Sequence, residues 1–293
     1  MTSIVAVVGA GLMGRGIAQV AATAGYRVLV HDTDATQWPD ALSAITASLD
    51  KFVEKGTITA EQRADALARL EFHGALDALG GAELVIEAIV EQLDAKRELW
   101  RRLEHICSPA TMFGSNTSSL AIVDQAVGLD HPERLVGLHF FNPVPMMQLV
   151  EVVRSVRTAP EVVDRAEAFV RAIGRVPVRC RDESGFVVNR LLVPYLLDAV
   201  RVLEGGTGHI ADIDTAMTLG AGHPMGPLTL LDFVGLDTVV RIAEIMFDQY
   251  REPRFAPPPL LRRMVAAGHL GRKNGKGFYD WSVKPPVPME LGL

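Results

Sequence analysis

Residues 4–14 read IVAVVGAGLMG, and this stretch decides the fold. Its five apolar, mostly β-branched residues predict a buried strand, and Gly9-Ala10-Gly11-Leu12-Met13-Gly14 turns that strand directly into a helix. Glycines at this spacing arise often by chance, so the context carries the interpretation. Here a strand precedes the glycines, a helix with small residues follows them, and the next strand ends at Asp32, about twenty residues on. The pattern indicates a dinucleotide-binding turn.

Each position of this turn has a physical role. Gly9 permits the tight turn, and Gly11 removes a side chain that would block a pyrophosphate. Gly14 lets the helix lie close to the sheet. The helix N-terminus, which includes Leu12 and Met13, supplies unpaired N–H groups to the anion.

Asp32 indicates which dinucleotide binds. A carboxylate at the end of the second strand hydrogen-bonds the adenosine ribose hydroxyls and repels a 2′-phosphate. The residues that follow, 33–36, supply no Arg or Lys to offset that repulsion. We therefore expect the cofactor to be NAD rather than NADP.

Short β-branched runs alternate with longer helical stretches from Ile4 to about Cys180, which predicts an α/β domain with a doubly wound parallel sheet. The expected strands are Ile4–Val8, Arg27–His31, Leu84–Ala88, Met112–Ser115, Leu135–Phe140, Leu149–Val153 and Val176–Cys180. The expected helices are Leu12–Ala24, Ala35–Lys55, Ala60–Leu70, Asp94–Cys107 and Pro160–Ile173.

After Glu183 the remaining sequence reads as helices divided by Gly- and Pro-rich turns. We therefore expect three parts. Residues 1–183 form a Rossmann-type NAD-binding domain, residues 184–281 a smaller all-α domain for substrate binding and dimerisation, and residues 282–293 a flexible, proline-rich tail.

Composition excludes several classes of partner. A net charge of −6 provides no positive field for nucleic acid, although local amides and lysines can still bind a small phosphate-bearing ligand. The most apolar long stretch, 186–203, is interrupted by charged residues, so we expect no membrane partner. The N-terminus has no basic leader, and Cys107 and Cys180 have no metal-ligand spacing. We expect a cytoplasmic protein with free, buried thiols and no metal.

Residues 135–151, LVGLHFFNPVPMMQLVE, carry the candidate chemistry. His139 lies near the end of an apolar strand, and a Pro-interrupted connection leads to a second strand that bears Glu151. A carboxylate against one imidazole nitrogen fixes the tautomer and stabilises the imidazolium that forms when the ring takes a proton. From spacing alone, however, a single His on an apolar strand is more often a satisfied core residue.

A resemblance that covers essentially the whole chain favours the catalytic interpretation. The sequence resembles the 3-hydroxyacyl-CoA dehydrogenase family, which includes bacterial 3-hydroxybutyryl-CoA dehydrogenases. The segments that carry the likeness follow one another in the family's order: residues 7–19, 85–100, 115–120 (SNTSSL), 139–153, 185–194 (GFVVNRLLVP), 212–237 and 270–281 (LGRKNGKGFYDW).

The resemblance implies a role for each matching position. His139 corresponds to the catalytic base, Glu151 to its carboxylate partner, Ser118 to the serine that hydrogen-bonds the reacting oxygen and Asn189 to a substrate-binding asparagine. The positions that resemble contacts of the nicotinamide half or lie near the cofactor are Glu91, Lys96, Asn116, Asn142 and Lys273. Lys51 and Lys55 match a helical projection over coenzyme A, where a solvated charged face explains them equally well.

The implied reaction is the NAD-dependent oxidation of an (S)-3-hydroxyacyl-CoA, which we expect to be of short chain, to the 3-oxo thioester. Two alternatives stay open: a same-scaffold dehydrogenase of a free hydroxy or sugar acid such as gulonate, and a protein that binds NADH without turnover.

Residues 186–203 and 228–246 carry more apolar surface than a domain of about a hundred residues can bury alone. We therefore expect a two-fold symmetric homodimer through the C-terminal domain, in agreement with the family's dimers.

Overall fold

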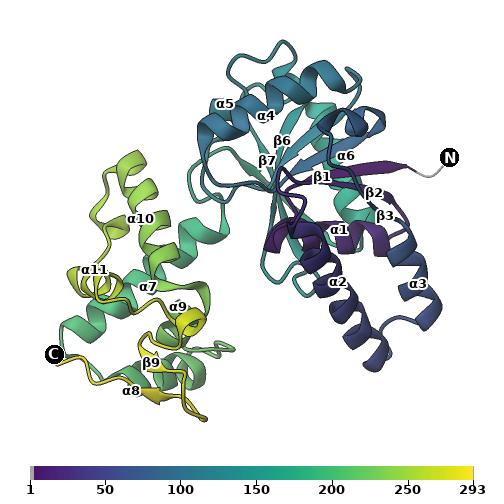
Figure 1. The fold of residues 1–293 in the computed structure, drawn as a ribbon. Helices are drawn as coiled ribbons and strands as arrows, with labels where there is room; N and C mark the ends of the chain where they lie inside the picture. The colour runs from purple at the N-terminus through teal and green to yellow at the C-terminus, as the bar shows by residue number, and fades with distance from the viewer. Residues whose placement is uncertain (1–2, 293) are drawn as a thin grey trace. The chain divides into compact units, whose positions relative to one another are not determined.

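The N-terminal part of the chain forms an eight-stranded sheet in the computed structural model, which describes residues 3–292 (Figure 1). The strand order is β3-β2-β1-β4-β5-β6-β7-β8. The strands are β1 Ile4–Val8, β2 Arg27–His31, β3 Leu70–Phe72, β4 Leu84–Glu87, β5 Met112–Ser115, β6 Leu135–Phe140, β7 Leu149–Arg154 and β8 Val176–Arg181. The predicted α/β fold class is confirmed.

The sheet differs from the prediction at two places. β6 and β7 are antiparallel, whereas the sequence pattern predicts a parallel sheet. The connection between them, residues 141–148, is too short for a parallel crossover, which needs about a dozen residues or more. β3 was not predicted, because its three residues give too short a run to show a periodicity.

Helices cover both faces of this sheet. The helices of the first unit are α1 Leu12–Thr23, α2 Gln37–Glu54, α3 Ala60–Ala68, α4 Leu93–Ile106, α5 Ile122–Gln125 and α6 Pro160–Ala172, with short 3₁₀ turns η1 Leu76–Gly81 and η2 Pro132–Arg134. α1 and α6 pack with the even-numbered residues of β6, such as Leu138, whereas α4 and α5 belong to the cluster that contains Leu135. Alternation along β6 therefore directs His139 toward the α5 face.

α2 and α3 form a helical hairpin that extends from the sheet (Figure 1). Ala41, Ile45 and Leu49 give α2 a buried stripe at four-residue spacing, and α1 packs against both helices. A capping box between Thr59 and Gln62 begins α3.

Residues Val187–Leu293 form a second compact unit, separate from the first unit of Met1–Phe186. Its elements are α7 Val188–Glu204, α8 Ile210–Thr215, a π-helical turn η3 Ala216–Gly220, α9 Pro227–Val234, α10 Leu236–Tyr250, η4 Pro253–Phe255, α11 Pro259–Ala266, η5 Arg272–Asn274, β9 Tyr279–Asp280 and β10 Val287–Pro288. α7 begins two residues after Phe186, the first residue of the apolar stretch 186–203. Phe186 has a φ of 47°, in the left-handed region, which a right-handed helix does not use.

The segment from Ser282, which we expect to form a flexible arm, contains one short strand. β10 pairs with β9 as a small antiparallel sheet, and the Met289 amide donates to the Phe278 carbonyl at 2.9 Å. Buried Asp232 anchors the β9 side of this sheet, because its carboxylate accepts from the amides of Phe278 and Tyr279. The short pairing was not visible in a sequence interrupted by prolines.

Both cysteines are free thiols in the first unit, as expected. Cys107 is buried and Cys180 is partly buried. Burial raises the pKa of Cys107 to about 11 and that of Cys180 to about 12, so both thiols stay protonated at neutral pH. Over the described part of the chain, no helix is long and apolar enough to cross a membrane.

Candidate active site

The glycine turn between β1 and α1 has the shape that a pyrophosphate requires. Gly9 has a φ of 104°, and its amide donates to the His31 carbonyl at 2.7 Å. A Cβ on Gly14 would lie 1.7 Å from the Gly9 carbonyl oxygen, so only glycine lets α1 begin this close to the strand. A Cβ on Gly11 would meet nothing within 4 Å, which leaves open space over the N-terminus of α1. No side chain caps that N-terminus, and its amides at Leu12 and Met13 remain directed toward this space.

Asp32 lies beside this turn and also helps to build it. One carboxylate oxygen accepts from the Ala10 amide at 2.7 Å, and the other accepts from the Asp34 amide at 2.9 Å. Each oxygen keeps a second lone pair for a ribose hydroxyl. The residues present therefore fit the adenosine half of a dinucleotide, and the structural task of Asp32 is one that the sequence did not reveal.

His139 and Glu151 face each other across the antiparallel pair β6–β7. They are direct register partners, so their side chains lie on the same side of the sheet. Nδ1 of His139 lies 2.7 Å from Oε2 of Glu151, and both residues are buried. A carboxylate can only accept here, so Nδ1 carries a hydrogen, and in the neutral ring Nε2 is the nitrogen with the lone pair. The structure thus brings together the two residues that the sequence paired.

Two phenylalanines enclose the imidazole of His139. The Phe141 ring centroid lies 4.4 Å away and the Phe186 ring centroid 5.6 Å away. These contacts restrict rotation of the ring and exclude water from one side of it. Sequence reasoning missed both residues as parts of the site, since a phenylalanine in an apolar run gives no specific signal.

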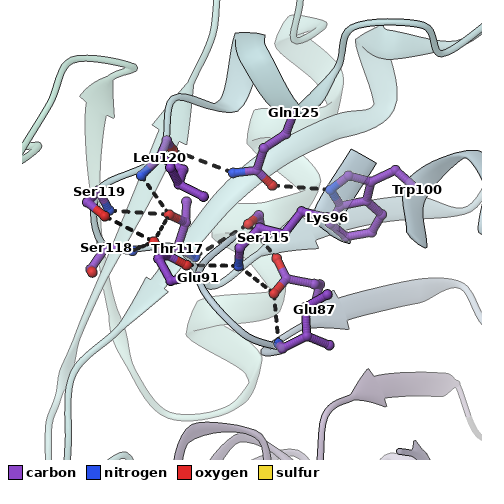
Figure 2. A network of polar contacts seen from close by, with 11 residues as sticks. Glu87, Glu91, Lys96, Trp100, Ser115, Thr117, Ser118, Ser119, Leu120 and Gln125 are labelled. Atoms are coloured by element: carbon purple, nitrogen blue, oxygen red, sulfur yellow. Dashed lines mark hydrogen bonds and ion pairs between the residues drawn. The ribbon is translucent and has the colours of Figure 1, made fainter. Parts of the chain in front are cut away.

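A buried ionic network lies at the carboxyl end of β4 and β5 (Figure 2). Lys96, which is only 1% exposed, places Nζ 2.6 Å from Oε1 of Glu87 and 3.0 Å from Oε2 of Glu91. Glu87 also accepts from the Ile89 amide at 2.8 Å and from the Ser115 hydroxyl at 2.7 Å. Glu87 was missed from the sequence, although a carboxylate that ends an apolar strand could have indicated it.

Glu91 joins this network to the segment that contains Ser118. Its carboxylate accepts from the Thr117 hydroxyl, from the Ser119 hydroxyl at 3.1 Å and from the Ser118 amide at 3.3 Å. Burial raises the pKa of Glu91, but the Lys96 charge and the hydroxyl donors outweigh it and hold the pKa below its ordinary value. Glu91 is therefore ionised at neutral pH.

Ser118 and Asn116 follow β5 at the same edge of the sheet. In Figure 2 the Ser118 side chain lies at the margin of the network, with its hydroxyl directed away from Glu91. Asn116 accepts from the Phe140 amide at 2.9 Å through Oδ1, which ties the end of β5 to the end of β6. Its amide nitrogen remains a donor at this edge.

The remaining candidate residues belong to other elements of the two units. Asn142 is exposed and precedes a cis peptide bond to Pro143. Lys51 and Lys55 are exposed at the C-terminal end of α2. Asn189 and Lys273 belong to the second unit. Asn189 is partly buried in the first turn of α7, and Lys273 is exposed and lies 2.5 Å from the Asp237 carboxylate.

A cavity of about 540 Å³ opens in the first unit, and the sequence did not reveal it. Its walls come from the ends of α1, α2 and α6 and from Pro145, Met146 and Gln148 of the loop that follows β6. Arg175 is the one charged residue among its lining residues. The guanidinium donates to the carbonyls of Pro145 at 3.0 Å and Gly174 at 3.3 Å, whereas its buried Nε has no partner.

Comparisons with known proteins agree with this architecture. Residues 4–183 match the family model for the 3-hydroxyacyl-CoA dehydrogenase NAD-binding domain, and residues 185–281 match the model for the C-terminal domain of the same family. A 3-hydroxybutyryl-CoA dehydrogenase of Mycobacterium tuberculosis is 47% identical over 94% of this chain and 98% of its own length. A 3-hydroxybutyryl-CoA dehydrogenase of Bradyrhizobium diazoefficiens is 41% identical over 97% of both chains.

A solved structure extends the likeness to three dimensions. The crystal structure of an (S)-3-hydroxybutyryl-CoA dehydrogenase from Ralstonia eutropha is 38% identical, with a TM-score of 0.93, and the match covers 97% of this chain and 100% of that one. The glycine turn, the doubly wound sheet and the helical second unit all lie within the matched region. This chain therefore belongs to the 3-hydroxyacyl-CoA dehydrogenase family, and its first unit is that family's NAD-binding domain.

Proposed function

We propose that this protein interconverts an (S)-3-hydroxyacyl-CoA of short chain, such as 3-hydroxybutyryl-CoA, and the corresponding 3-oxoacyl-CoA with NAD and NADH. The observation that carries the proposal is the buried contact of 2.7 Å between His139 and Glu151, in a domain that also contains a dinucleotide turn. The names of the relatives, which are 3-hydroxybutyryl-CoA dehydrogenases, supply the substrate class.

His139 acts as the general base in the oxidation. Nε2 takes the proton of the 3-hydroxyl group, because Nδ1 is already committed to Glu151. The Glu151 carboxylate stabilises the imidazolium that results and returns it to the same tautomer afterwards. In the reverse direction the imidazolium donates this proton to the 3-oxo oxygen.

NAD, when bound, supplies the acceptor for the C3 hydride. Ser118 donates its hydroxyl hydrogen to the reacting oxygen, and the Glu91 carboxylate holds the Ser118 backbone in place. Orientation of this kind matters because a misplaced acceptor loses much of the proximity gain. Three further ligands are proposed from the family resemblance alone: Asn189 for the substrate, and Lys273 and Asn142 for the cofactor.

The cavity beside Arg175 favours a coenzyme A thioester over a free hydroxy acid. Its lining residues Pro145 and Met146 lie on the loop that starts at the end of β6, one residue after His139 in that strand. A substrate long enough to pass from the His139 face around the end of β6 to the opposite face brings its distant end to a guanidinium without a carboxylate partner in the cavity. Coenzyme A carries phosphates at that end, whereas a small sugar acid does not reach so far. Lys51 and Lys55 are proposed as further phosphate contacts.

A catalytic protein is also favoured over a binder of NADH without turnover. A protein that only binds the dinucleotide has no use for an imidazole that a buried carboxylate holds in one tautomer. Burial of the Glu151 carboxylate also favours a catalytic protein, because burying a charge costs folding free energy and stability alone gives no reason to bury this one.

We also propose a homodimer through the second unit. Large apolar side chains remain exposed on it, with Leu191 66% exposed, Leu219 83% exposed and Phe233 44% exposed. Where exposed apolar residues form one contiguous patch, the patch commonly marks an interaction site. A two-fold symmetric contact with a second copy would cover them.

Replacing His139 with Ala should slow acetoacetyl-CoA reduction by about a hundredfold to ten-thousandfold, because the proton donor is lost. NADH binding, followed by fluorescence, should change little. His131→Ala is a matched control, since His131 also lies beside a carboxylate, Glu133 at 3.2 Å, but both side chains are half exposed. Equal losses of turnover and NADH binding in His139→Ala would indicate a structural role.

Replacing Asp32 with Ala should relax the preference for NAD over NADP by about tenfold or more, because a charged hydrogen-bond acceptor is removed. The measurement is the ratio of kcat/KM for the two cofactors. Asp32→Asn, which keeps one acceptor for the Ala10 amide, controls for damage to the turn. An unchanged ratio in both variants refutes the assignment.

Replacing Arg175 with Met should raise KM for acetoacetyl-CoA by about tenfold, since a charge-assisted contact to a phosphate is lost. KM for S-acetoacetyl-N-acetylcysteamine, which lacks the nucleotide, should stay unchanged. Arg171→Met provides the control, because Arg171 lies four residues before Arg175, near the end of α6, but is exposed and paired with Glu167. A similar rise in KM for both thioesters contradicts the location of the coenzyme A end.

Sedimentation analysis of the whole chain should give the mass of a dimer at micromolar concentration. Leu219→Glu and Leu191→Glu should weaken the dimer, because each places a charge in the proposed contact. A surface charge in the first unit, introduced by Val156→Glu at a residue that is 94% exposed, should not. A monodisperse monomer of the unaltered protein rules out the dimer.

A further inference from the structure

The buried charges at the carboxyl end of β4 and β5 do not balance. Glu87 and Glu91 supply two carboxylates, and Lys96 supplies one ammonium between them. The side chains of Glu87 and Lys96 are 0% and 1% exposed, and that of Glu91 is 20% exposed. The network therefore carries a net charge of about −1 in a region with little water.

Hydrogen bonds surround the two carboxylates of the network. Three donors point at the Glu87 carboxylate, from Ile89, Lys96 and Ser115. The Lys96 ammonium lies within 3.0 Å of both carboxylates.

Stability alone gives no reason for the second carboxylate. One carboxylate would balance Lys96, and each further buried charge costs folding free energy through lost hydration. The surplus negative charge is therefore explained if a positively charged group binds at this site and balances it.

The position of Glu87 indicates what that group is. Glu87 ends β4, beside Val8 at the end of β1 and Ser115 at the end of β5. A dinucleotide crosses the carboxyl ends of the strands in a doubly wound sheet. Its adenosine half belongs near Asp32, so its other half extends over β4 and β5 toward His139.

We infer that the surplus negative charge of the Glu87–Lys96–Glu91 network biases the site toward the oxidised cofactor. The nicotinamide ring carries a positive charge in NAD and none in NADH, whereas the remainder of the molecule is common to both. A fixed negative charge near the ring thus lowers the dissociation constant of NAD relative to that of NADH. This inference rests on the proposed function only in that the dinucleotide binds at this edge of the sheet.

The expected effect is measurable. One elementary charge at roughly 10 Å, with an effective dielectric constant of about 20, changes the affinity for a cation by about tenfold. The neutral ring of NADH should respond much less. Glu87 acts here as a specificity-determining residue through its charge.

The test is the Glu87→Gln variant of the whole chain, with no acyl substrate present. Dissociation constants of NAD and NADH are measured by calorimetry and by NADH fluorescence. We expect the ratio of the NAD constant to the NADH constant to rise about tenfold. Glu87→Asp, which keeps the charge, should restore the ratio to within about twofold. Ser115→Ala removes a neutral hydrogen bond to the same carboxylate and should leave the ratio unchanged.

Each other outcome has a clear meaning. Equal weakening of both nucleotides in Glu87→Gln makes Glu87 a structural residue and overturns the inference. If that variant fails to fold, Glu91→Gln removes one charge from the same network and must raise the ratio in the same direction. A wild-type protein that binds neither nucleotide contradicts the proposed function, whereas an unchanged ratio with both nucleotides bound contradicts this inference alone.

Discussion

The antiparallel pairing of β6 with β7 is the constraint from which the site follows. It places His139 directly opposite Glu151, so the imidazole and its carboxylate meet through the pairing of two strands. Both backbones are fixed by the sheet ladder, and Phe141 and Phe186 limit what freedom the ring retains. The orientation of the imidazole is thus a property of the sheet and does not require a ligand.

Much of the fold could be predicted because its signals are local. The strands Arg27–His31, Met112–Ser115 and Leu135–Phe140 have the expected bounds, since β-branched runs bounded by turns are unambiguous at that length. The glycine turn was recognisable for the same reason. The direction of β7 was predicted incorrectly, although the short connection 141–148 already excluded a parallel crossover.

The site was predictable only where its residues interact over short separations or match a family pattern. His139 and Glu151 satisfied both conditions. Glu87 and Arg175 satisfied neither, because their importance lies in contacts made by other segments: Lys96 and Ser115 for the first, and Pro145 for the second. A carboxylate at a strand end and an arginine after a helix are common in any sequence. Only the coordinates show that Glu87 accepts three hydrogen bonds and that Arg175 has no carboxylate beside it in its cavity.

The glycine turn, Asp32, the imidazole and its carboxylate all belong to the unit that ends at Phe186. In the proposed function, the dinucleotide turn and the proton-transfer pair therefore lie on one continuous piece of chain. Substitutions in the second unit that spare Asn189 and Lys273 leave that piece unchanged. Such an arrangement would let the alcohol substrate change while the groups that exchange the hydride and the proton stay the same.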